Sequence, residues 1–262
     1  MRRLWIVSLL LLTACATSPL GRSQLQFFPD EQMTQMGAVA YEDIRQQTPE
    51  VQDPDVRQYV TCVANAVTRE VEEAGSGGWV VTVFEQDQAN AFALPGGKIG
   101  VYSGLLDVAK SEDQLAAVVA HEVAHVLADH SNERVSTAYA TETGVQLIGA
   151  LAGTGSEDKQ QLMSLLGVGA QVGIILPFSR TQESEADLVG LDLMARAGFD
   201  PRAAVDLWQN MEKQADGSPP EFLSTHPSHG SRIDELRERM PRAMKLYRQA
   251  RAQGKRPNCP RP

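Results

Sequence analysis

The residues His121-Glu122-Val123-Ala124-His125 have the types and the spacing of a hydrolytic metal site. An α-helix advances roughly 100° per residue, so the two histidines fall on one face with Glu122 close beside them. Catalytic zinc takes three protein ligands and keeps a fourth position for water, which a glutamate at this place in the motif can deprotonate. The pattern therefore predicts one zinc ion per chain, with His121 and His125 as ligands and Glu122 as the general base.

This chemistry needs a helix, and the flanking residues predict one from about Ser111 to Ala128. Ser111 is a suitable N-cap with Gln114 as its capping-box partner, and apolar residues recur at helical spacing after them. A helix with so many apolar residues must be buried. Buried polar side chains that have no hydrogen-bond partner destabilise the fold. Metal binding accounts for the buried His-Glu-His cluster better than the alternative, core histidines that are satisfied by packing alone.

Two helices and a small sheet are predicted before the metal helix. Acidic caps, β-branched runs and turn residues delimit them. The predicted elements are helices over 30–47 and from 53 to the glycine-rich break at 75–78, a strand over 79–84, and a hairpin with strands 91–94 and 98–102.

Helices dominate the rest of the chain, which makes the predicted fold α+β and mainly helical, with the small sheet packed over the metal helix. The uncharged segment 162–178 raises the possibility of membrane contact, but its polar residues and glycines favour a packed or surface-seeking helix. A loop that begins at Pro219 carries His226 and His229. The predicted helices cover 132–152, 157–176, 179–197, 200–214 and 231–240.

The first residues have the features of an export signal. Arg2 and Arg3 precede the apolar run 4–12, and the ending at Cys15 resembles a bacterial lipobox, in which cleavage leaves that cysteine as an acylated, palmitate-bearing N-terminus. A plain secretory signal or a membrane anchor is the alternative. Ala16 points to the outer membrane, by resemblance to lipoprotein sorting signals. We therefore expect a signal peptide over 1–14, a lipidated N-terminus and spacer over 15–29, a catalytic domain over 30–240 and a basic tail over 241–262.

Net charge and cysteine content indicate which partners the protein can bind and in which compartment it folds. The net charge of −9 gives no electrostatic basis for binding nucleic acid. Export would place the protein in an oxidising periplasm, on the periplasmic face of the membrane that its lipid anchors it to. Cys62 and Cys259 are the two thiols that remain after lipidation, and we expect them to form a disulfide.

A third metal ligand must come from later in the chain, and spacing alone does not identify it. Glu183 and Asp187 lie four residues apart on one helical face, but surface charge pairing is the usual explanation for such spacing. Glu185 lies off that face and is expected to face solvent. His130 points away from the first two ligands, so we expect it to pack at the helix end.

Four blocks of this sequence resemble the zinc peptidases that include the CAAX prenyl proteases, HtpX and the Oma-type mitochondrial proteases. The similarity is closest to the soluble outer-membrane lipoprotein members and covers about 88–236. The lack of clear transmembrane spans departs from the membrane-embedded members and argues against prenylated or intramembrane substrates. The blocks are the Asn-Ala-Phe and Pro-Gly-Gly hairpin at 90–105, the HExxH segment 121–130, the Glu-x-x-Ala-Asp pattern at 183–187, and Ser-Thr-His-Pro at 224–227 followed by Arg232.

The resemblance implies a gluzincin-like site. Glu183 becomes the third zinc ligand, and Asp187 becomes a carboxylate that holds a histidine ligand in its productive tautomer. His226 and Arg232 are candidates for stabilising the oxyanion, although both fit equally well as loop and helix-surface residues. The strand that contains Asn90, Ala91, Phe92 and Ala93 would hold substrate by β-augmentation, or serve as a structural hairpin over the metal helix, or both.

The predicted function is that of a zinc-dependent endopeptidase that cleaves unfolded or misassembled envelope proteins in periplasmic quality control. A client-binding chaperone or assembly factor of the outer membrane, with suppressed or secondary proteolysis, is the alternative, but a pure binding module would not need Glu122. A structural zinc lipoprotein would need a fourth permanent ligand and no base. Cleavage assays on Glu122→Gln beside the wild type would separate these possibilities.

Overall fold

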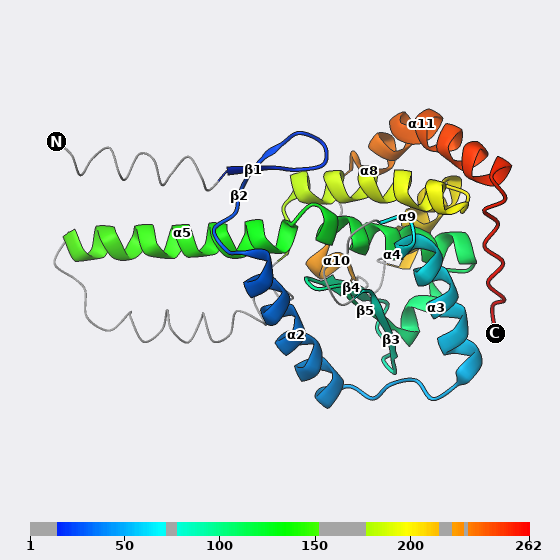
Figure 1. Cartoon of the computed structure of the whole chain (residues 1–262), viewed down its shortest axis with the longest axis horizontal. Helices are drawn as coiled ribbons and strands as arrows, with labels where there is room; N and C mark the ends of the chain where they lie inside the picture. Colours follow the sequence, from blue (N-terminus) through cyan, green and yellow to red (C-terminus); the bar gives the residue numbers. More distant parts are fainter. Residues whose placement is uncertain (1–14, 72–77, 152–176, 215–221, 228–229) are drawn as a thin grey trace.

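The computed structural model describes residues 15–71, 78–151, 177–214, 222–227 and 230–262. The described chain is mainly helical with two small sheets, which confirms the predicted α+β class (Figure 1). Strands β1 (Cys15–Thr17) and β2 (Ser23–Leu25) pair antiparallel in the region expected to be a spacer. None of the described helices is long and apolar enough to cross a membrane.

The larger sheet has the strand order β3-β5-β4. Strand β5 (Lys98–Tyr102) runs parallel to β3 (Val80–Phe84) and antiparallel to β4 (Ala91–Leu94). The β4–β5 hairpin confirms the prediction, and its turn uses the positive φ angles of Gly96 and Gly97, which are 83° and 75°. Strand β4 is therefore an edge strand, and it packs against the metal helix.

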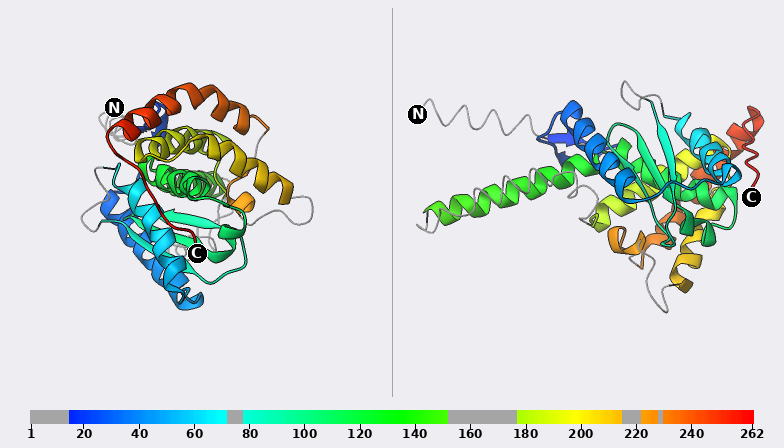
Figure 2. Two further views of the ribbon diagram at one scale, coloured as in Figure 1. Left: turned by 90° about the vertical axis from the view of Figure 1, so that its right-hand side faces the viewer. Right: turned by 90° about the horizontal axis from the view of Figure 1, so that it is seen from below.

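The metal helix α4 (Glu112–Leu127) lies between this sheet and helix α8 (Arg180–Ala197), as the left view of Figure 2 shows. Its predicted cap is present, because the Ser111 side chain accepts a hydrogen bond from the Gln114 N–H. Helix α8 begins with a capping box at Ser179 and ends at the left-handed Gly198. A Cβ at Gly190 of α8 would lie 2.9 Å from the backbone nitrogen of His121, so only glycine permits this close approach of the two helices.

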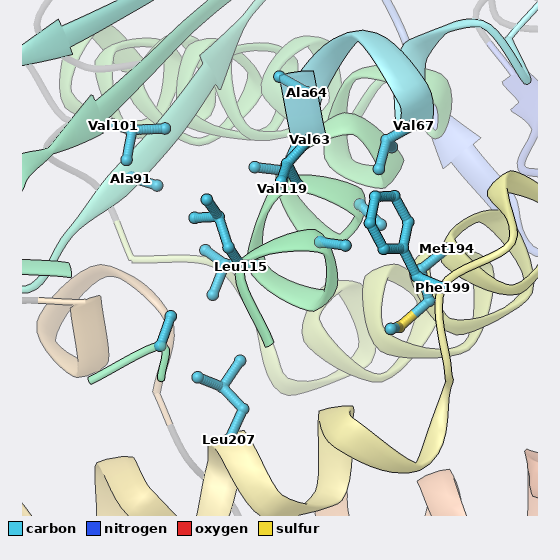
Figure 3. Packing of buried hydrophobic residues seen from close by; sticks show 14 of the residues in the cluster. Val63, Ala64, Val67, Ala91, Val101, Leu115, Val119, Met194, Phe199 and Leu207 are labelled. Atoms are coloured by element: carbon cyan, nitrogen blue, oxygen red, sulfur yellow. The ribbon is translucent and has the colours of Figure 1, made fainter. Parts of the chain in front are cut away.

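Three further helices of the described chain pack around the pair formed by α4 and α8, and a fourth lies against the sheet. Helices α3 (Pro54–Thr68) and α9 (Arg202–Gln214) contact α4, while α11 (Arg232–Ala252) covers α8 from the other side. Helix α2 (Asp30–Gln47) contacts β4 and β5. Figure 3 shows how Val63, Leu115, Val119, Met194 and Leu207 fill the space between these elements.

Helix α5 (His130–Leu151) follows α4 directly and extends away from the body of the molecule (Figures 1 and 2). It begins two residues before its predicted start. The predicted helix over 157–176 lies outside the described residues, and so does His229. The loop predicted to carry His226 contains the single-turn helix α10 (Phe222–Thr225).

Three sequence predictions for the remaining elements are tested by the structure. Helix α3 ends at Thr68, short of the predicted glycine break. The prediction that the last helix stops at Met240 is wrong, because α11 continues through Pro241 to Ala252. Ala243 and Ala250 extend its buried face beyond the proline, and this packing outweighs the one backbone hydrogen bond that proline loses. Cys62 and Cys259 are joined in a disulfide, with 5.7 Å between their Cα atoms.

Candidate metal centre

Four buried side chains converge on one point: His121 and His125 from α4, Glu183 from α8, and His226, which follows α10. One donor atom from each lies within 4.8 Å of all the others. The Nε2 atoms of His121 and His125 are 3.0 Å apart. Glu183 Oε1 lies 3.4 Å from His125 Nε2, and its Oε2 lies 3.5 Å from His121 Nε2.

This donor set fits zinc in chemistry and in size. Catalytic zinc sites combine imidazole nitrogen with a carboxylate, and ligand bonds of about 2.0–2.1 Å in a tetrahedron separate the donors by roughly 3.3 Å. The observed separations of 3.0–3.5 Å among His121, His125 and Glu183 bracket that value. Zinc is therefore the cofactor that these residues can hold.

Glu122 lies beside this cluster without belonging to its donor set. Its carboxylate accepts a hydrogen bond from the backbone of Ala93 on β4, and its Oε1 lies 3.4 Å from His226 Nε2. Burial raises the pKa of the Glu122 carboxyl, and the neighbouring histidines partly oppose that shift. A carboxylate with a raised pKa can accept a proton from water and give it up again, which suits a general base.

The surrounding carboxylates make the cluster favourable for positive charge. Burial lowers the pKa of His121, but contacts with Asp187 and Glu183 outweigh this effect and raise the pKa to about 9. Burial also raises the pKa of Glu183, yet the three histidines around it hold that pKa far below its usual range. The ligand carboxylate is therefore ionised and ready to neutralise a cation.

Asp187 holds His121 from the side opposite the cluster. Its Oδ1 lies 2.9 Å from His121 Nδ1, which favours a hydrogen on Nδ1 and leaves Nε2, the atom that faces the cluster, as the one to bind a cation. Arg232, at the start of α11, donates to both Asp187 oxygens at 2.6 and 2.9 Å. It also lies 2.9 Å from Glu183 Oε2, and its guanidinium stacks 3.6 Å from the centre of the Trp208 ring.

These contacts place Arg232 behind the ligands, where it is buried, hydrogen-bonded to Asp187 and ion-paired with Glu183. Its predicted alternative as a helix-surface residue is wrong, since only 2% of its surface is exposed. The geometry makes it a support for Asp187 and Glu183. An additional role toward a reaction oxyanion stays a prediction.

His125 is held in a similar way through a second histidine. Its Nδ1 lies 2.8 Å from His130 Nδ1, and His130 Nε2 lies 3.3 Å from Glu185 Oε2. His130 thus packs at the junction of α4 and α5, as predicted. The prediction that Glu185 faces solvent is wrong, because Glu185 is 4% exposed. Helix α8 is covered on several sides, so a residue that lies off the ligand face is buried too.

Aromatic rings enclose His226, and sequence reasoning assigned none of them a role. The ring centres of Phe178 and Phe222 lie 5.0 and 4.3 Å from that of His226, and both rings stack nearly parallel to the imidazole. Phe178 also stacks on His125 at 3.7 Å. Its position directly before the Ser179 cap of α8 was a usable signal, because the capped start of the ligand helix must lie close to the metal.

Strand β4 passes directly beside Glu122, and its backbone alternates in direction. Tyr102 N–H donates to the Asn90 carbonyl, so Phe92 and Leu94 form the next hydrogen-bonded pairs with β5. The backbone groups of Ala91 and Ala93 therefore face the outer edge of the sheet. Asn90 uses its side chain to accept from the Ala91 N–H at 2.9 Å. Within the described chain, no other strand pairs with that edge.

Comparison with known proteins places the site in context. The model of peptidase family M48 matches residues 51–240. The Schizosaccharomyces pombe protein "Mitochondrial metalloendopeptidase OMA1" is 37% identical over 212 residues, which are 79% of this chain and 61% of that protein. The "Beta-barrel assembly-enhancing protease" of Yersinia pestis is 32% identical over 216 residues, and that of Escherichia coli is 33% identical over 219.

These two bacterial matches cover 80% and 79% of this chain and 44% of each relative. The chain thus spans about half the length of the relatives it matches. The matched region contains the four residues of the metal cluster and Glu122. The family resemblance predicted from the four sequence blocks is confirmed.

Proposed function

The chain belongs to peptidase family M48, and from that premise we propose that it is a zinc-dependent endopeptidase that cleaves unfolded or misassembled polypeptides of the bacterial cell envelope. The observation that carries the proposal is the buried cluster of His121, His125 and Glu183, with the carboxylate of Glu122 next to it. Three ligands and an adjacent base form the arrangement that peptide hydrolysis requires.

The ligands and the base divide the chemistry between them. When bound, zinc supplies a Lewis acid that lowers the pKa of water and polarises the scissile carbonyl. Glu122 accepts a proton from the attacking water and returns it to the leaving amine. His226 Nε2, which lies 3.4 Å from Glu122 Oε1, can donate a hydrogen bond to the oxygen that becomes negative. Asp187 keeps the ring hydrogen of His121 away from the metal position.

The outer edge of β4 supports the proposed preference for unfolded substrates. Ala91 and Ala93 direct backbone groups outward beside Glu122. Their N–H groups bond to the side chains of Asn90 and Glu122, and an extended peptide that replaces these contacts can pair with the edge as an added strand. Backbone pairing requires a segment that has no partner in a folded domain of its own. Recognition is therefore expected to depend on the extended state of the substrate more than on one side chain.

The proposed location is the periplasmic face of the outer membrane, with the lipid on Cys15. It rests on the charged, apolar and lipobox-like features of residues 1–15. Palmitate labelling of the wild type beside Cys15→Ser tests it, with incorporation expected only in the wild type. A wild-type protein that incorporates no acyl chain and fractionates without membranes would remove the anchor from the proposal.

The test of the enzymatic proposal compares the wild type with Glu122→Gln and with the control Glu238→Gln, which changes an exposed glutamate on α11. We expect Glu122→Gln to keep its zinc content and to lose at least about a hundredfold in cleavage of an unfolded protein. Glu238→Gln should behave as the wild type does. Wild-type turnover by Glu122→Gln, in a preparation free of other proteases, would refute the assignment of the base.

A second candidate is an assembly factor that holds client proteins without depending on cleavage. It is favoured by one observation, the name "Beta-barrel assembly-enhancing protease" of two relatives. Complementation distinguishes the two candidates. An envelope defect that Glu122→Gln corrects as well as the wild type would support the assembly role.

A further inference from the structure

The N-terminal segment 16–28 lies across the junction where α4 ends and α5 begins. Gln24 donates from Nε2 to the Ala128 carbonyl at 2.6 Å, at the C-terminal end of the metal helix. The Phe27 N–H donates to Ser136 Oγ at 2.8 Å, and Asn132 Nδ2 donates to the Phe28 carbonyl at 2.7 Å. The segment is therefore fixed to the helix that carries His130.

Arg22 is the charged centre of this contact. Its guanidinium forms a two-pronged pair with Glu133 on α5, with 2.7 Å between Nη2 and Oε2. The Arg22 Nε donates to Glu185 Oε2 at 3.1 Å, and the Leu20 N–H donates to Glu185 Oε1 at 3.2 Å. Both oxygens of the buried Glu185 carboxylate are thus held by the N-terminal segment.

Glu185 passes this constraint to the metal cluster through two imidazole rings. The ionised Glu185 carboxylate accepts a hydrogen bond from the N–H at His130 Nε2. His130 Nδ1 therefore keeps its lone pair and accepts a hydrogen bond from the N–H at His125 Nδ1. His125 then has its lone pair on Nε2, the atom that faces His121 and Glu183. In this series of hydrogen bonds, the tautomer of each imidazole ring is set by the contact that its other ring nitrogen makes.

We propose that Arg22 is a positioning residue for the metal centre: it fixes Glu185, and Glu185 acts through His130 to orient His125 for zinc. The inference rests on the proposed function, because it concerns the same zinc site. It assigns the segment that follows the predicted lipid anchor a part in building that site.

The burial pattern explains why removing Arg22 affects the relay and not only the surface. Arg22 is partly exposed, whereas Glu185 and His130 are 4% and 0% exposed. Without the Arg22 Nε–H donor, Glu185 Oε2 is no longer held beside His130, and the carboxylate can turn toward water. That turn removes the acceptor that holds the hydrogen of His130 on Nε2.

The experiment compares Arg22→Met and Arg22→Lys with the matched control Arg45→Met. Arg45 on α2 also pairs with two glutamates, Glu42 and Glu50, but those pairs are exposed and do not reach the cluster. Zinc dissociation constants are measured by competition with a chelator. The ring nitrogens of His125 are followed by nuclear magnetic resonance in the zinc-free protein, where they report the tautomer directly.

We expect Arg22→Met to weaken zinc binding about tenfold, the lower end of the loss that follows removal of a supporting contact to a metal ligand. Arg22→Lys should recover part of this loss, because it restores charge without the two-pronged geometry. Glu185→Gln should reproduce the loss, and the double variant should lose no more than the larger single effect. The His125 signal should change from the Nδ1–H tautomer to a mixture, while Arg45→Met stays within about twofold of the wild type.

An Arg22→Met protein with the zinc affinity and the His125 tautomer of the wild type would overturn the inference, whatever its activity. Equal losses in Arg22→Met and Arg45→Met would also overturn it, because they would indicate a general charge effect. Failure of the proposed function gives a different result: the wild type would bind zinc and show the expected tautomer, yet cleave nothing.

Discussion

The Cys62–Cys259 disulfide should contribute a few kcal/mol to stability without contributing to catalysis. The two cysteines are 197 positions apart, so the link closes most of the chain into one loop when the protein unfolds. The loss of chain entropy in the unfolded state corresponds to about 5 kcal/mol for a loop of this length. This value is an upper bound, because strain in the folded state reduces it.

Hydrogen bonds around Cys259 keep the C-terminal segment docked on the folded protein when the disulfide is absent, so the loss of stability is smaller. The Cys259 N–H donates to Glu112 Oε2 at 2.7 Å, at the start of the metal helix, and Arg261 donates to the carbonyls of Lys110 and Leu106. These bonds hold the end of the chain in place without the covalent link. We therefore expect Cys62→Ala combined with Cys259→Ala to lose about 2–4 kcal/mol.

Urea unfolding of the zinc-free protein in the presence of a chelator measures this loss, since zinc would add its own binding free energy to the folded state. Adding dithiothreitol to the wild type should produce the same shift in midpoint, and the double variant should not respond to it. A difference below about 0.5 kcal/mol, or two free thiols in protein purified from an oxidising compartment, would refute the reasoning.

Three further predictions concern the site itself. His226→Ala removes a ring whose Nδ1 lies 3.0 Å from Glu183 Oε1, within reach of the metal position. Cleavage should increase if this ring blocks the metal position, and it should decrease if the main role of the ring is to stabilise the oxyanion. The kcat on an unfolded substrate measures the direction, and an unchanged kcat would leave the residue with a structural role. Asp187→Asn should weaken zinc binding about 10- to 100-fold, because an amide no longer anchors the His121 Nδ1–H as a carboxylate does; chelator competition checks this, and wild-type affinity would contradict it. Gly190→Ala should lower the free energy of unfolding in urea by about 1–3 kcal/mol, because the added Cβ pushes α8 away from α4. Gly230→Ala should lower it far less, because a Cβ there meets nothing within 4 Å. Equal losses would contradict the packing argument.

Local sequence signals predicted the parts of this site that lie within one helix. The spacing of His121, Glu122 and His125 and the cap at Ser111 depend only on helical geometry, and α4 has both features. Glu183 required a family resemblance, because nothing within α8 indicates which of its faces packs on α4. That choice depends on the close approach at Gly190, a contact between segments far apart in the chain.

The error at Glu185 has the same origin. Two residues after Glu183, it points about 200° away around the helix, and a helix with one buried face would expose it. Helix α8 instead packs on α4 with one face and on α11 with another, and the N-terminal segment covers Glu185. Amphipathic reasoning fails for a helix enclosed on several sides, because its polar residues are then satisfied by partners that the local pattern does not reveal.

The supports of the two histidine ligands come from opposite ends of the described chain. Arg232 of α11 holds the carboxylate that orients His121, while Arg22 of the N-terminal segment holds the carboxylate that contacts the partner of His125. Each arginine satisfies a buried anion, so neither ligand ring is fully held until its own end of the chain has docked. The zinc site therefore depends on the docking of both ends, although its ligands lie on two central helices.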